Sequence, residues 1–399
     1  MQFSQLIASL EESATLALSK KVRELKAAGK DVIGLTLGEP DFDTPAHIVA
    51  AAKQALDEGY THYPPVAGYP ELREAIAAKL KRDNALDYSS KQIVVSTGAK
   101  QSLYNVVLSL LNPGDEAILP APYWVSYHAM LHLGQADIKV VQTTIEADYK
   151  ISPAQLEASL TDKTKLFFLT TPSNPTGSMY SQGELAALVE VLERYPNCYI
   201  ISDEIYEFIT FGQAHISLGT FDSIFERVIT VNGFSKGYAM TGWRLGYIAA
   251  APEVAAVAEK MQGQCTSGAN AFAQRGAIAA LNSPLDATFA MRDSFHQRRD
   301  MMHQALSAIP DVQVNMPDGA FYFYPDLSRF LGRKSPDGQV IDNINTLCNY
   351  MIDSVGLALV PGTAFGTAEH VRISYAYSEA QLQDALRRFE KGLLALTKS

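Results

Sequence analysis

Short apolar runs alternate with helical patterns between about residue 50 and residue 250 of the chain. The runs are QIVV (92–95), EAILP (116–120), KLFFLT (165–170), CYIIS (198–202), RVITV (227–231) and GYIAA (246–250). Between them lie stretches such as AKQSLYNVVLSLL and GELAALVEVLERY, whose apolar residues recur at helical spacing. Near-continuous apolar strands that alternate with helices predict an α/β fold with a mostly parallel sheet covered by helices on both faces.

The pattern changes in the last third of the chain. Residues 250–310 follow a helical pattern, and the strands expected after them are AFYFYP (320–325), GLALVP (356–361) and HVRISYA (370–376). The first 30 residues form one amphipathic helical pattern, which we expect to join this part of the chain. We therefore predict a large domain over residues 46–285 and a small α/β domain built from residues 1–45 and 286–399.

Composition and charge narrow the classes of partner. The 399 residues carry a formal net charge of −10, and 47% of them are apolar, which is ordinary for a globular protein. An acidic chain without a basic run does not hold nucleic acid through bulk charge. The three cysteines, Cys198, Cys265 and Cys348, have no metal-binding spacing and are interpreted as reduced thiols. We expect neither a metal nor a nucleic-acid partner.

Neither a signal peptide nor a membrane span is expected. The amino-terminal segment lacks a basic start followed by an apolar block. The longest uncharged run, residues 117–136, is interrupted by two prolines and two histidines. These features predict a soluble cytoplasmic protein.

Lys236 lies in the segment VNGFSKGYAMTGWRLGY, residues 231–247, which holds only one other charge, Arg244. One explanation is a lysine at a strand end whose amine reaches the surface along its apolar stem. The other is a desolvated amine with a lowered pKa, which acts as a nucleophile or forms a Schiff base. The lysine alone does not decide between the two.

Residues that could contact a ligand follow several of the predicted strands. In an open parallel sheet, ligands bind beyond the carboxyl ends of the strands. The residues at these positions are Gly98, Ala99 and Lys100 after QIVV, Trp124 after EAILP, Asn174 after KLFFLT, Asp203 after CYIIS and Lys236 after RVITV. We expect them to share one site.

A protein that holds an electrophilic carbonyl permanently on a lysine usually holds pyridoxal phosphate, and this cofactor makes specific demands. Its ring nitrogen needs a buried carboxylate, which Asp203 could supply, although an ordinary helix N-cap also explains that residue. Its phosphate needs helix-end amides, a hydroxyl and a guanidinium, which Gly98, Ser235 and Arg244 could provide. A tight turn and a surface ion pair remain the alternatives for Gly98 and Arg244.

The ring and the phenolic oxygen of such a cofactor need further partners. Trp124, one of two tryptophans, could stack on the ring or could pack in the core. Tyr206 and Asn174 could donate to the phenolic oxygen, and the Asn174–Pro175 bond is a candidate cis peptide. Each residue has an ordinary explanation alone, but their order at successive strand ends favours a shared cofactor site.

Longer motifs extend this pattern over nearly the whole chain. They are GEPDFDTP, YPPVAGYPELREAIA, STGAKQSLYN, PYWVSY, SNPTG, SDEIYE, NGFSKGYAMTGWRLGY, GAFYFYP, PGTAFG and HVRISYA. With them the chain resembles the class I aminotransferases of pyridoxal-phosphate fold type I, in particular the bacterial aspartate aminotransferases. The resemblance implies a seven-stranded sheet in the large domain and a small domain that closes over the substrate. It also implies transfer of an amino group from an L-amino acid, with aspartate favoured, to 2-oxoglutarate by a ping-pong mechanism with pyridoxal 5′-phosphate.

The resemblance implies a role for each candidate residue. Lys236 carries the cofactor and moves the α-proton of the substrate, while Asp203 pairs with the ring nitrogen. Tyr206 and Asn174 hydrogen-bond the phenolic oxygen, and Trp124 stacks on the ring. The residues around the phosphate are Gly98, Ala99, Lys100, Ser235 and Arg244, joined by Tyr63 from the neighbouring subunit of a homodimer with shared active sites.

Two carboxylate sites follow from the same resemblance. Arg372 grips the α-carboxylate of the substrate through two parallel hydrogen bonds, and Gly38 offers its backbone N–H to the same group. No arginine lies between Arg244 and Arg275, where the animal-type enzymes carry the arginine for the distal carboxylate. The candidates for the distal carboxylate here are Lys100, Ser13 and Thr15.

Several alternatives share these motifs. Lys100 could serve the phosphate region instead of a distal carboxylate. Relatives with similar motifs accept aromatic amino acids, alanine or prephenate, and a carbon–sulfur lyase on this fold would share Lys236 and Asp203. A regulator that uses the fold as a ligand sensor would carry an added DNA-binding domain, and we expect none here. A nucleotide-binding protein would need GxxxxGK[ST], which the sequence lacks.

Overall fold

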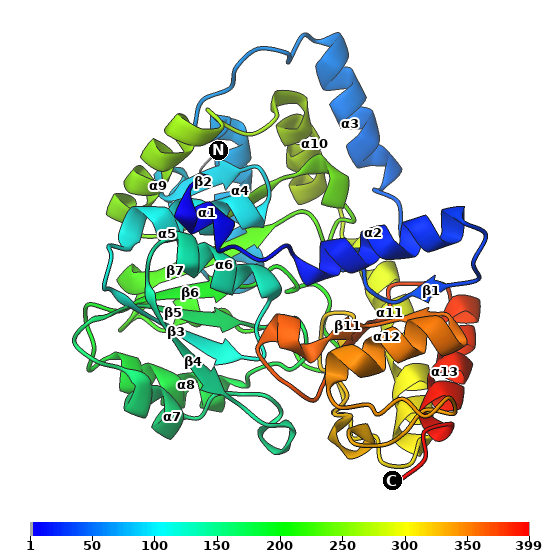
Figure 1. Ribbon diagram of the computed structural model, residues 1–399. Coiled ribbons are helices and arrows are strands. Elements are labelled where there is room, and N and C mark those ends of the chain that lie inside the picture. Colours follow the sequence, from blue (N-terminus) through cyan, green and yellow to red (C-terminus); the bar gives the residue numbers. More distant parts are fainter. Residues whose placement is uncertain (1–2, 399) are drawn as a thin grey trace.

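The computed structural model describes residues 3–398 and shows a large α/β part beside a smaller part built by both chain ends (Figure 1). The large part holds a seven-stranded sheet with the order β2-β8-β7-β6-β5-β3-β4. The strands are β2 (Ile93–Ser96), β3 (Glu116–Ala121), β4 (Asp137–Gln142), β5 (Thr164–Thr170), β6 (Tyr199–Asp203), β7 (Val228–Gly233) and β8 (Gly246–Ala249). Among them β8 alone runs against its neighbours, so the predicted seven-stranded, mostly parallel sheet is confirmed.

Apolar side chains on both faces of the central strands hold the helices against the sheet. In β5, Leu166 and Phe168 join one apolar cluster, while Phe167 and Leu169 join another. Successive side chains of a strand point to opposite faces, so a run that is apolar throughout must be covered on both sides. The helices on the first face are α5 (Ala99–Leu110), α6 (Val125–Leu133) and α9 (Pro252–Cys265), and those on the second are α7 (Pro153–Ser159) and α8 (Gln182–Leu192).

A third apolar cluster joins β2 and β8 to three further helices. These are α3 (Ala46–Asp57), α4 (Pro70–Asn84) and α10 (Ala271–Asn282). Short 3₁₀ helices lie at Ser90–Gln92, Ile145–Ala147, Leu218–Thr220, Phe225–Arg227, Thr241–Trp243, Ser328–Phe330 and Gly362–Phe365.

The ends of several strands meet at one edge of the sheet. Strand β8 begins where β2 and β7 end, because Gly246 pairs with both Ser96 and Gly233. A Cβ atom on Gly246 would lie 2.2 Å from the backbone nitrogen of Ala99. A glycine is therefore required for β8 to start against the first turn of α5. This close approach brings the residues that follow β2 and β7 together.

The smaller part combines segments from both ends of the chain. Its elements are α2 (Ala14–Ala27), β1 (Ile33–Gly34), α11 (Asp286–Ala308), β9 (Tyr322–Phe323), α12 (Ile344–Val355), β10 (Leu357–Ala358), β11 (Val360–Pro361), β12 (Val371–Ser374) and α13 (Glu379–Leu394). Helix α1 (Gln5–Ala8) instead lies beside α5 and α6 of the large part (Figure 1). Strand β1 pairs with β10, and β12 lies between β11 and β9 in an antiparallel sheet. Helix α2 contacts this part through Val22, which packs with Ile352 and Ala358.

The small-domain strands are shorter than the apolar runs predicted. The run 320–325 yields only Tyr322–Phe323, and 370–376 yields Val371–Ser374. The run 356–361 divides into β10 and β11, which pair with different sheets. These residues are apolar because they are buried in the core, and not because they belong to one long strand.

Two further expectations are wrong in detail. The amino-terminal pattern forms two helices, and Ser9 after the first of them contacts His132 of α6 at 2.8 Å. The cis peptide bonds lie at Ala121–Pro122 and Thr171–Pro172, and not at Asn174–Pro175. In SNPTG the chain reverses through a hydrogen bond from the Gly177 N–H to the Ser173 carbonyl, so the turn needs no cis bond there.

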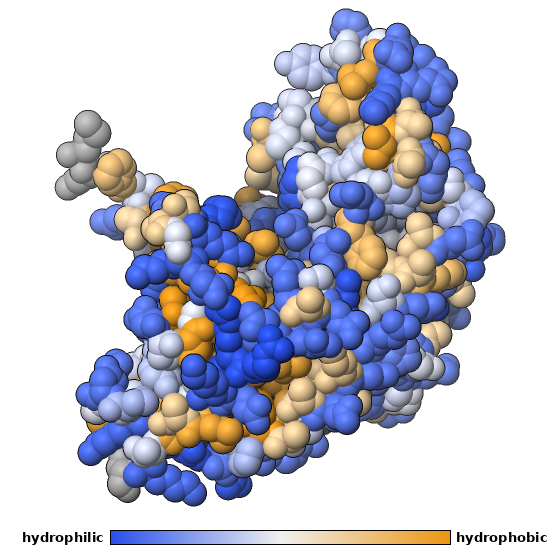
Figure 2. All heavy atoms as spheres, turned by 90° about the vertical axis from the view of Figure 1, so that its right-hand side faces the viewer, coloured by the Kyte–Doolittle hydropathy of each residue, from blue (hydrophilic) through white to orange (hydrophobic). Residues whose placement is uncertain are grey.

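The surface seen in Figure 2 is largely hydrophilic, with scattered apolar patches and a hollow. Within residues 3–398, no helix has both the length and the apolar character that a membrane crossing requires. The described residues also contain no group of three or more histidine, cysteine, aspartate or glutamate side chains placed to hold a metal ion.

Candidate active site

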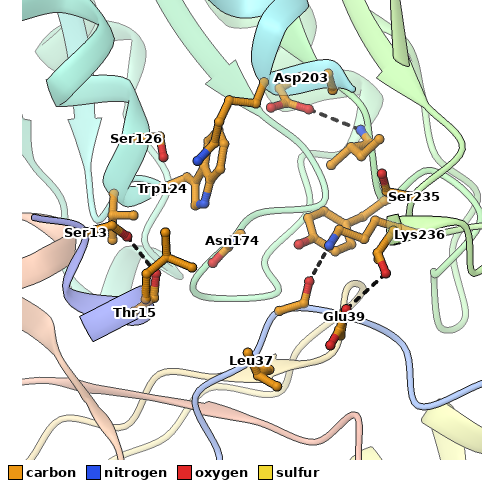
Figure 3. Close-up of a pocket in the computed structure, with 18 of the residues that line it drawn as sticks. Ser13, Thr15, Leu37, Glu39, Trp124, Ser126, Asn174, Asp203, Ser235 and Lys236 are labelled. Carbon is orange, nitrogen blue, oxygen red and sulfur yellow. Dashed lines mark hydrogen bonds between the residues drawn. The ribbon is translucent and has the colours of Figure 1, made fainter. Parts of the chain in front are cut away.

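A cavity of about 420 Å³ opens at the strand-end edge, between the large sheet and the smaller part. Among the fifteen candidate site residues predicted from the sequence, all but Gly98 and Tyr63 line it. Those in its wall are Ser13, Thr15, Gly38, Ala99, Lys100, Trp124, Asn174, Asp203, Tyr206, Ser235, Lys236, Arg244 and Arg372. Figure 3 shows Ser13 and Thr15 on one side of this cavity and Lys236 on the other.

Lys236 follows β7 and points its amine into the cavity (Figure 3). The amine donates a hydrogen bond to the carbonyl of Gly38 and lies 5.8 Å from the centre of the Tyr206 ring. Burial lowers the pKa of the Lys236 amine to about 8, with Glu39 opposing the shift and Arg372 adding to it. A lysine with this pKa is partly neutral near pH 7–8, as a nucleophile or proton acceptor must be.

Asp203 ends β6 and is buried, on the opposite side of the cavity from Leu37 and Glu39 (Figure 3). Its Oδ2 accepts a 2.6 Å hydrogen bond from the Tyr127 hydroxyl, and its Oδ1 accepts one of 3.3 Å from the Ile205 N–H. Burial raises the pKa of the Asp203 carboxyl to about 6, while the bond from Tyr127 acts in the opposite direction. Among the ion pairs of the described residues, none involves Asp203, so its charge is available to a cationic group in the cavity.

Gly98 stands at the start of α5 with a backbone φ of 81°, a conformation that favours glycine. A Cβ atom there would lie 2.7 Å from Nη2 of Arg244. Arg244 donates from Nη1 to the Thr241 carbonyl at 3.0 Å, and no ion pair of the described chain includes it. The helix start, the guanidinium and the neighbouring Ser235 hydroxyl together form a place for an anion.

Arg372 lies in β12, the central strand of its small sheet, and is 2% exposed. Its Nη1 donates to Oδ1 of Asn174 at 3.1 Å, and its Nη2 donates to the Thr36 carbonyl at 2.6 Å. Nε has no hydrogen-bond partner, and no described acidic side chain pairs with this guanidinium. A buried guanidinium without an acid is a strong site for a carboxylate ligand. From the sequence alone, Arg372 could also be an exposed residue at a sheet edge; the structure shows that this interpretation is wrong.

Besides Arg372, a second cationic side chain, that of Lys100, lines the cavity. Ser13, which precedes α2, and Thr15, in the first turn of α2, form a hydrogen bond of 3.0 Å between their hydroxyls. The Lys100 amine lies 4.9 Å from the centre of the Trp124 ring, and burial and then Arg244 lower its pKa. Among the described residues, no acidic side chain forms an ion pair with Lys100. These groups could hold a second negative charge on a ligand.

Tyr206 and Asn174 also line the cavity. Tyr206 is buried beside the hydroxyl of Tyr322, at 2.7 Å between the two oxygens. Burial raises the pKa of the Tyr206 phenol well above its usual range, so this hydroxyl keeps its proton.

Tyr63 lies outside the cavity and is 94% exposed in the single chain.

Sequence reasoning missed Tyr127, Glu39 and Tyr322. Tyr127 lies four residues after Tyr123 in PYWVSY, and its spacing on a helix from a strand-end tryptophan could have suggested a cavity position. Glu39 accepts from the Thr241 hydroxyl at 3.0 Å beside the lysine segment. Tyr322 stands in the apolar run GAFYFYP, where an aromatic residue reads as ordinary core.

The residues fit the cofactor that the sequence predicts. Lys236 offers an amine of lowered pKa for an aldehyde, and Asp203 offers a buried carboxylate for a ring nitrogen. The start of α5 has the glycine that leaves room beside Arg244, as a phosphate site at a helix end needs. The three groups come from three different strand ends that the sheet brings to one edge.

Comparisons with known proteins show the family and the fold. The family model described as aminotransferase class I and II matches residues 30–389. A probable aspartate/prephenate aminotransferase of Rhizobium leguminosarum bv. phaseoli is 45% identical, covering 96% of this chain and 97% of the relative. An aspartate aminotransferase structure from Rhizobium meliloti superposes with a TM-score of 0.96, at 38% identity over 100% of both chains. One from Thermus thermophilus, solved with maleate, gives 0.92 at 36% identity, over 98% of this chain and 100% of the other.

Proposed function

The chain belongs to the class I and II aminotransferases, and we propose that it transfers the amino group of aspartate to 2-oxoglutarate, with Lys236 holding pyridoxal 5′-phosphate. Transamination and the need for this cofactor follow from the family. The choice of aspartate and the role of each residue belong to the proposal. The observation that carries it is the buried Arg372 guanidinium, which lines the same cavity as Lys236 and has no described acidic partner.

Each residue has a defined task in this reaction. Pyridoxal 5′-phosphate, when bound, supplies an aldehyde and a protonated ring that accepts electrons from the bond broken at the α-carbon of the substrate. Lys236 would hold the aldehyde through its amine and would accept the α-proton of the substrate, for which its lowered pKa suits it. Asp203 keeps the proton on the ring nitrogen, because its buried carboxylate stabilises a positive charge beside it.

The binding residues set the orientation. Arg372 holds the α-carboxylate, which decides which bond of the α-carbon faces the electron-accepting ring. Tyr206 and Asn174 would donate to the phenolic oxygen of the bound cofactor, and Trp124 would pack against its ring; all three line the cavity. Gly38 carries the segment that covers Lys236 and helps to exclude water from the site.

The second cation supports a dicarboxylate substrate. Lys100 lines the cavity together with Ser13 and Thr15, and its amine lies 4.9 Å from the centre of the Trp124 ring. Aspartate and 2-oxoglutarate each carry a second carboxylate that such a group would bind. The names of the relatives include aspartate and prephenate, and the Thermus thermophilus structure holds maleate, which is itself a dicarboxylate.

A homodimer is part of the proposal. Tyr63 is 94% exposed on the loop before α4 although it is a large aromatic residue, as expected of a side chain that reaches a neighbouring subunit. In this arrangement it would contact the phosphate bound by the partner chain. Light scattering on the purified protein should give the mass of two chains, and a single-chain mass at assay concentration would contradict shared sites. A cytoplasmic location stays a prediction.

An amino-donor panel tests the proposed substrate. Purified protein loaded with pyridoxal 5′-phosphate is given 2-oxoglutarate with aspartate, alanine, phenylalanine or tyrosine, and glutamate is measured. Prephenate replaces 2-oxoglutarate in a second series with aspartate as donor. We expect the highest kcat/KM with aspartate. Fast aromatic donors with slow aspartate would contradict the aspartate assignment and leave transamination intact.

Lys100→Ala separates the two interpretations of that residue. We expect kcat/KM for aspartate to fall about 10- to 100-fold and that for alanine to change little, because only aspartate has a distal carboxylate to lose. The exposed Lys91→Ala variant serves as the control. An equal fall for both donors, with faster loss of cofactor on dialysis, would assign Lys100 to the phosphate instead.

A further inference from the structure

Tyr322 touches three parts of the active site with one side chain. It lies in β9 with no exposed surface except where it lines the cavity. Its hydroxyl is 2.7 Å from that of Tyr206. The guanidinium of Arg372 lies over the Tyr322 ring, with its central carbon 4.6 Å from the ring centre. The small sheet thereby reaches Tyr206, which belongs to the large part.

The third contact is with Gly38. A Cβ atom on Gly38 would lie 2.6 Å from the Tyr322 hydroxyl oxygen but 3.6 Å from the ring carbon that bears it. The backbone of Gly38 is outside the left-handed region, so an alanine there meets only this steric obstacle. The carbonyl of Gly38 accepts the hydrogen bond from Lys236. The Tyr322 hydroxyl therefore lies close beside the glycine whose carbonyl holds the lysine amine.

We propose that Tyr322 is a positioning residue that fixes the Tyr206 phenol, the depth of Gly38 above Lys236 and the plane of the Arg372 guanidinium. This inference rests on the proposed function. Burial raises the pKa of the Tyr322 and Tyr206 phenols, so both hydroxyls keep their protons. When Tyr322 donates to the Tyr206 oxygen, the Tyr206 proton is free to point at an acceptor in the cavity.

The first test is the pH dependence of light absorption by the cofactor-loaded protein without substrate. Tyr322→Phe keeps the ring under Arg372 and removes only the hydroxyl. Without the Tyr322 hydroxyl, the Tyr206 phenol is oriented less well and stabilises the anionic phenolic oxygen of the cofactor less. The midpoint pH of the absorption change should therefore rise by about 0.5–1 pH unit. The matched control is Tyr375→Phe, which removes a buried hydroxyl that donates to the Ala320 carbonyl away from the cavity wall. A midpoint that is unchanged, lowered or equal to that of the control would overturn the inference.

The second test needs no cofactor. Gly38→Ala should lower the unfolding temperature of the cofactor-free protein by about 3 °C or more, because the added carbon meets the Tyr322 hydroxyl. In the Tyr322→Phe background the nearest atom would be 3.6 Å away, so the same substitution should cost much less. The role of Tyr322 would be contradicted if Gly38→Ala lowered the unfolding temperature equally in the wild-type and Tyr322→Phe backgrounds. It would also be contradicted if Tyr375→Phe reduced the effect of Gly38→Ala as much as Tyr322→Phe does. Wild-type protein without a pH-sensitive absorption band would instead contradict the proposed function.

Discussion

Replacing Lys236 with alanine should abolish turnover, lowering kcat by at least about 10⁴-fold. The amine is the only described lysine nitrogen that lies beside Gly38 and Tyr206 in the cavity, and its lowered pKa suits proton transfer. The variant should still bind pyridoxal 5′-phosphate without a covalent bond, because the helix start at Gly98 and the Arg244 guanidinium remain. Transamination rates and equilibrium dialysis of the cofactor measure the two effects.

Controls separate this loss from damage to the fold. The exposed Lys260→Ala variant should keep full activity, and circular dichroism should show the same helical content for both variants. Added small amines should restore part of the rate to Lys236→Ala if the missing function is proton transfer alone. Wild-type turnover by Lys236→Ala would remove the lysine from the mechanism.

Arg372→Leu should lower kcat/KM by about 10²- to 10³-fold for every amino donor. Arg372 is buried without a described acidic partner, so the substrate α-carboxylate is the charge that it is placed to hold. Monocarboxylate and dicarboxylate substrates both carry this group, so alanine and aspartate should lose to a similar extent. Steady-state kinetics with both donors measure the effect.

Two variants define what the loss means. Arg372→Lys keeps the charge but not the two-pronged geometry, and should recover only part of the lost rate. Arg387→Leu, on the exposed side of α13, should behave as wild type. A loss confined to aspartate would mean that Arg372 binds the distal carboxylate and that the two carboxylate sites have been exchanged.

The sequence predicts those site residues that follow strands. Lys236 and Asp203 stand directly after apolar runs, and parallel strands bring such positions to one edge whatever the loops do. Arg372 was found through the resemblance, because a charge within a short strand gives no sign of the side chain's direction. The local pattern alone also left Asp203 open to interpretation as a helix cap.

Other features depend on distant segments and could not be read locally. Tyr127 and Tyr322 look like core aromatic residues, and their roles arise only because Asp203 and Gly38 arrive from elsewhere in the chain. Strand β4, with the mixed sequence DIKVVQ, was missed because an edge strand needs little apolar surface.

The most direct test of the central claim is borohydride reduction of the protein loaded with pyridoxal 5′-phosphate, followed by peptide mapping. If Lys236 holds the cofactor covalently, one pyridoxyl group per chain should be found on the peptide that contains VNGFSKGY, and the Lys236→Ala protein should carry none. A wild-type protein that carries no such group, or carries it on surface lysines alone, would contradict the account.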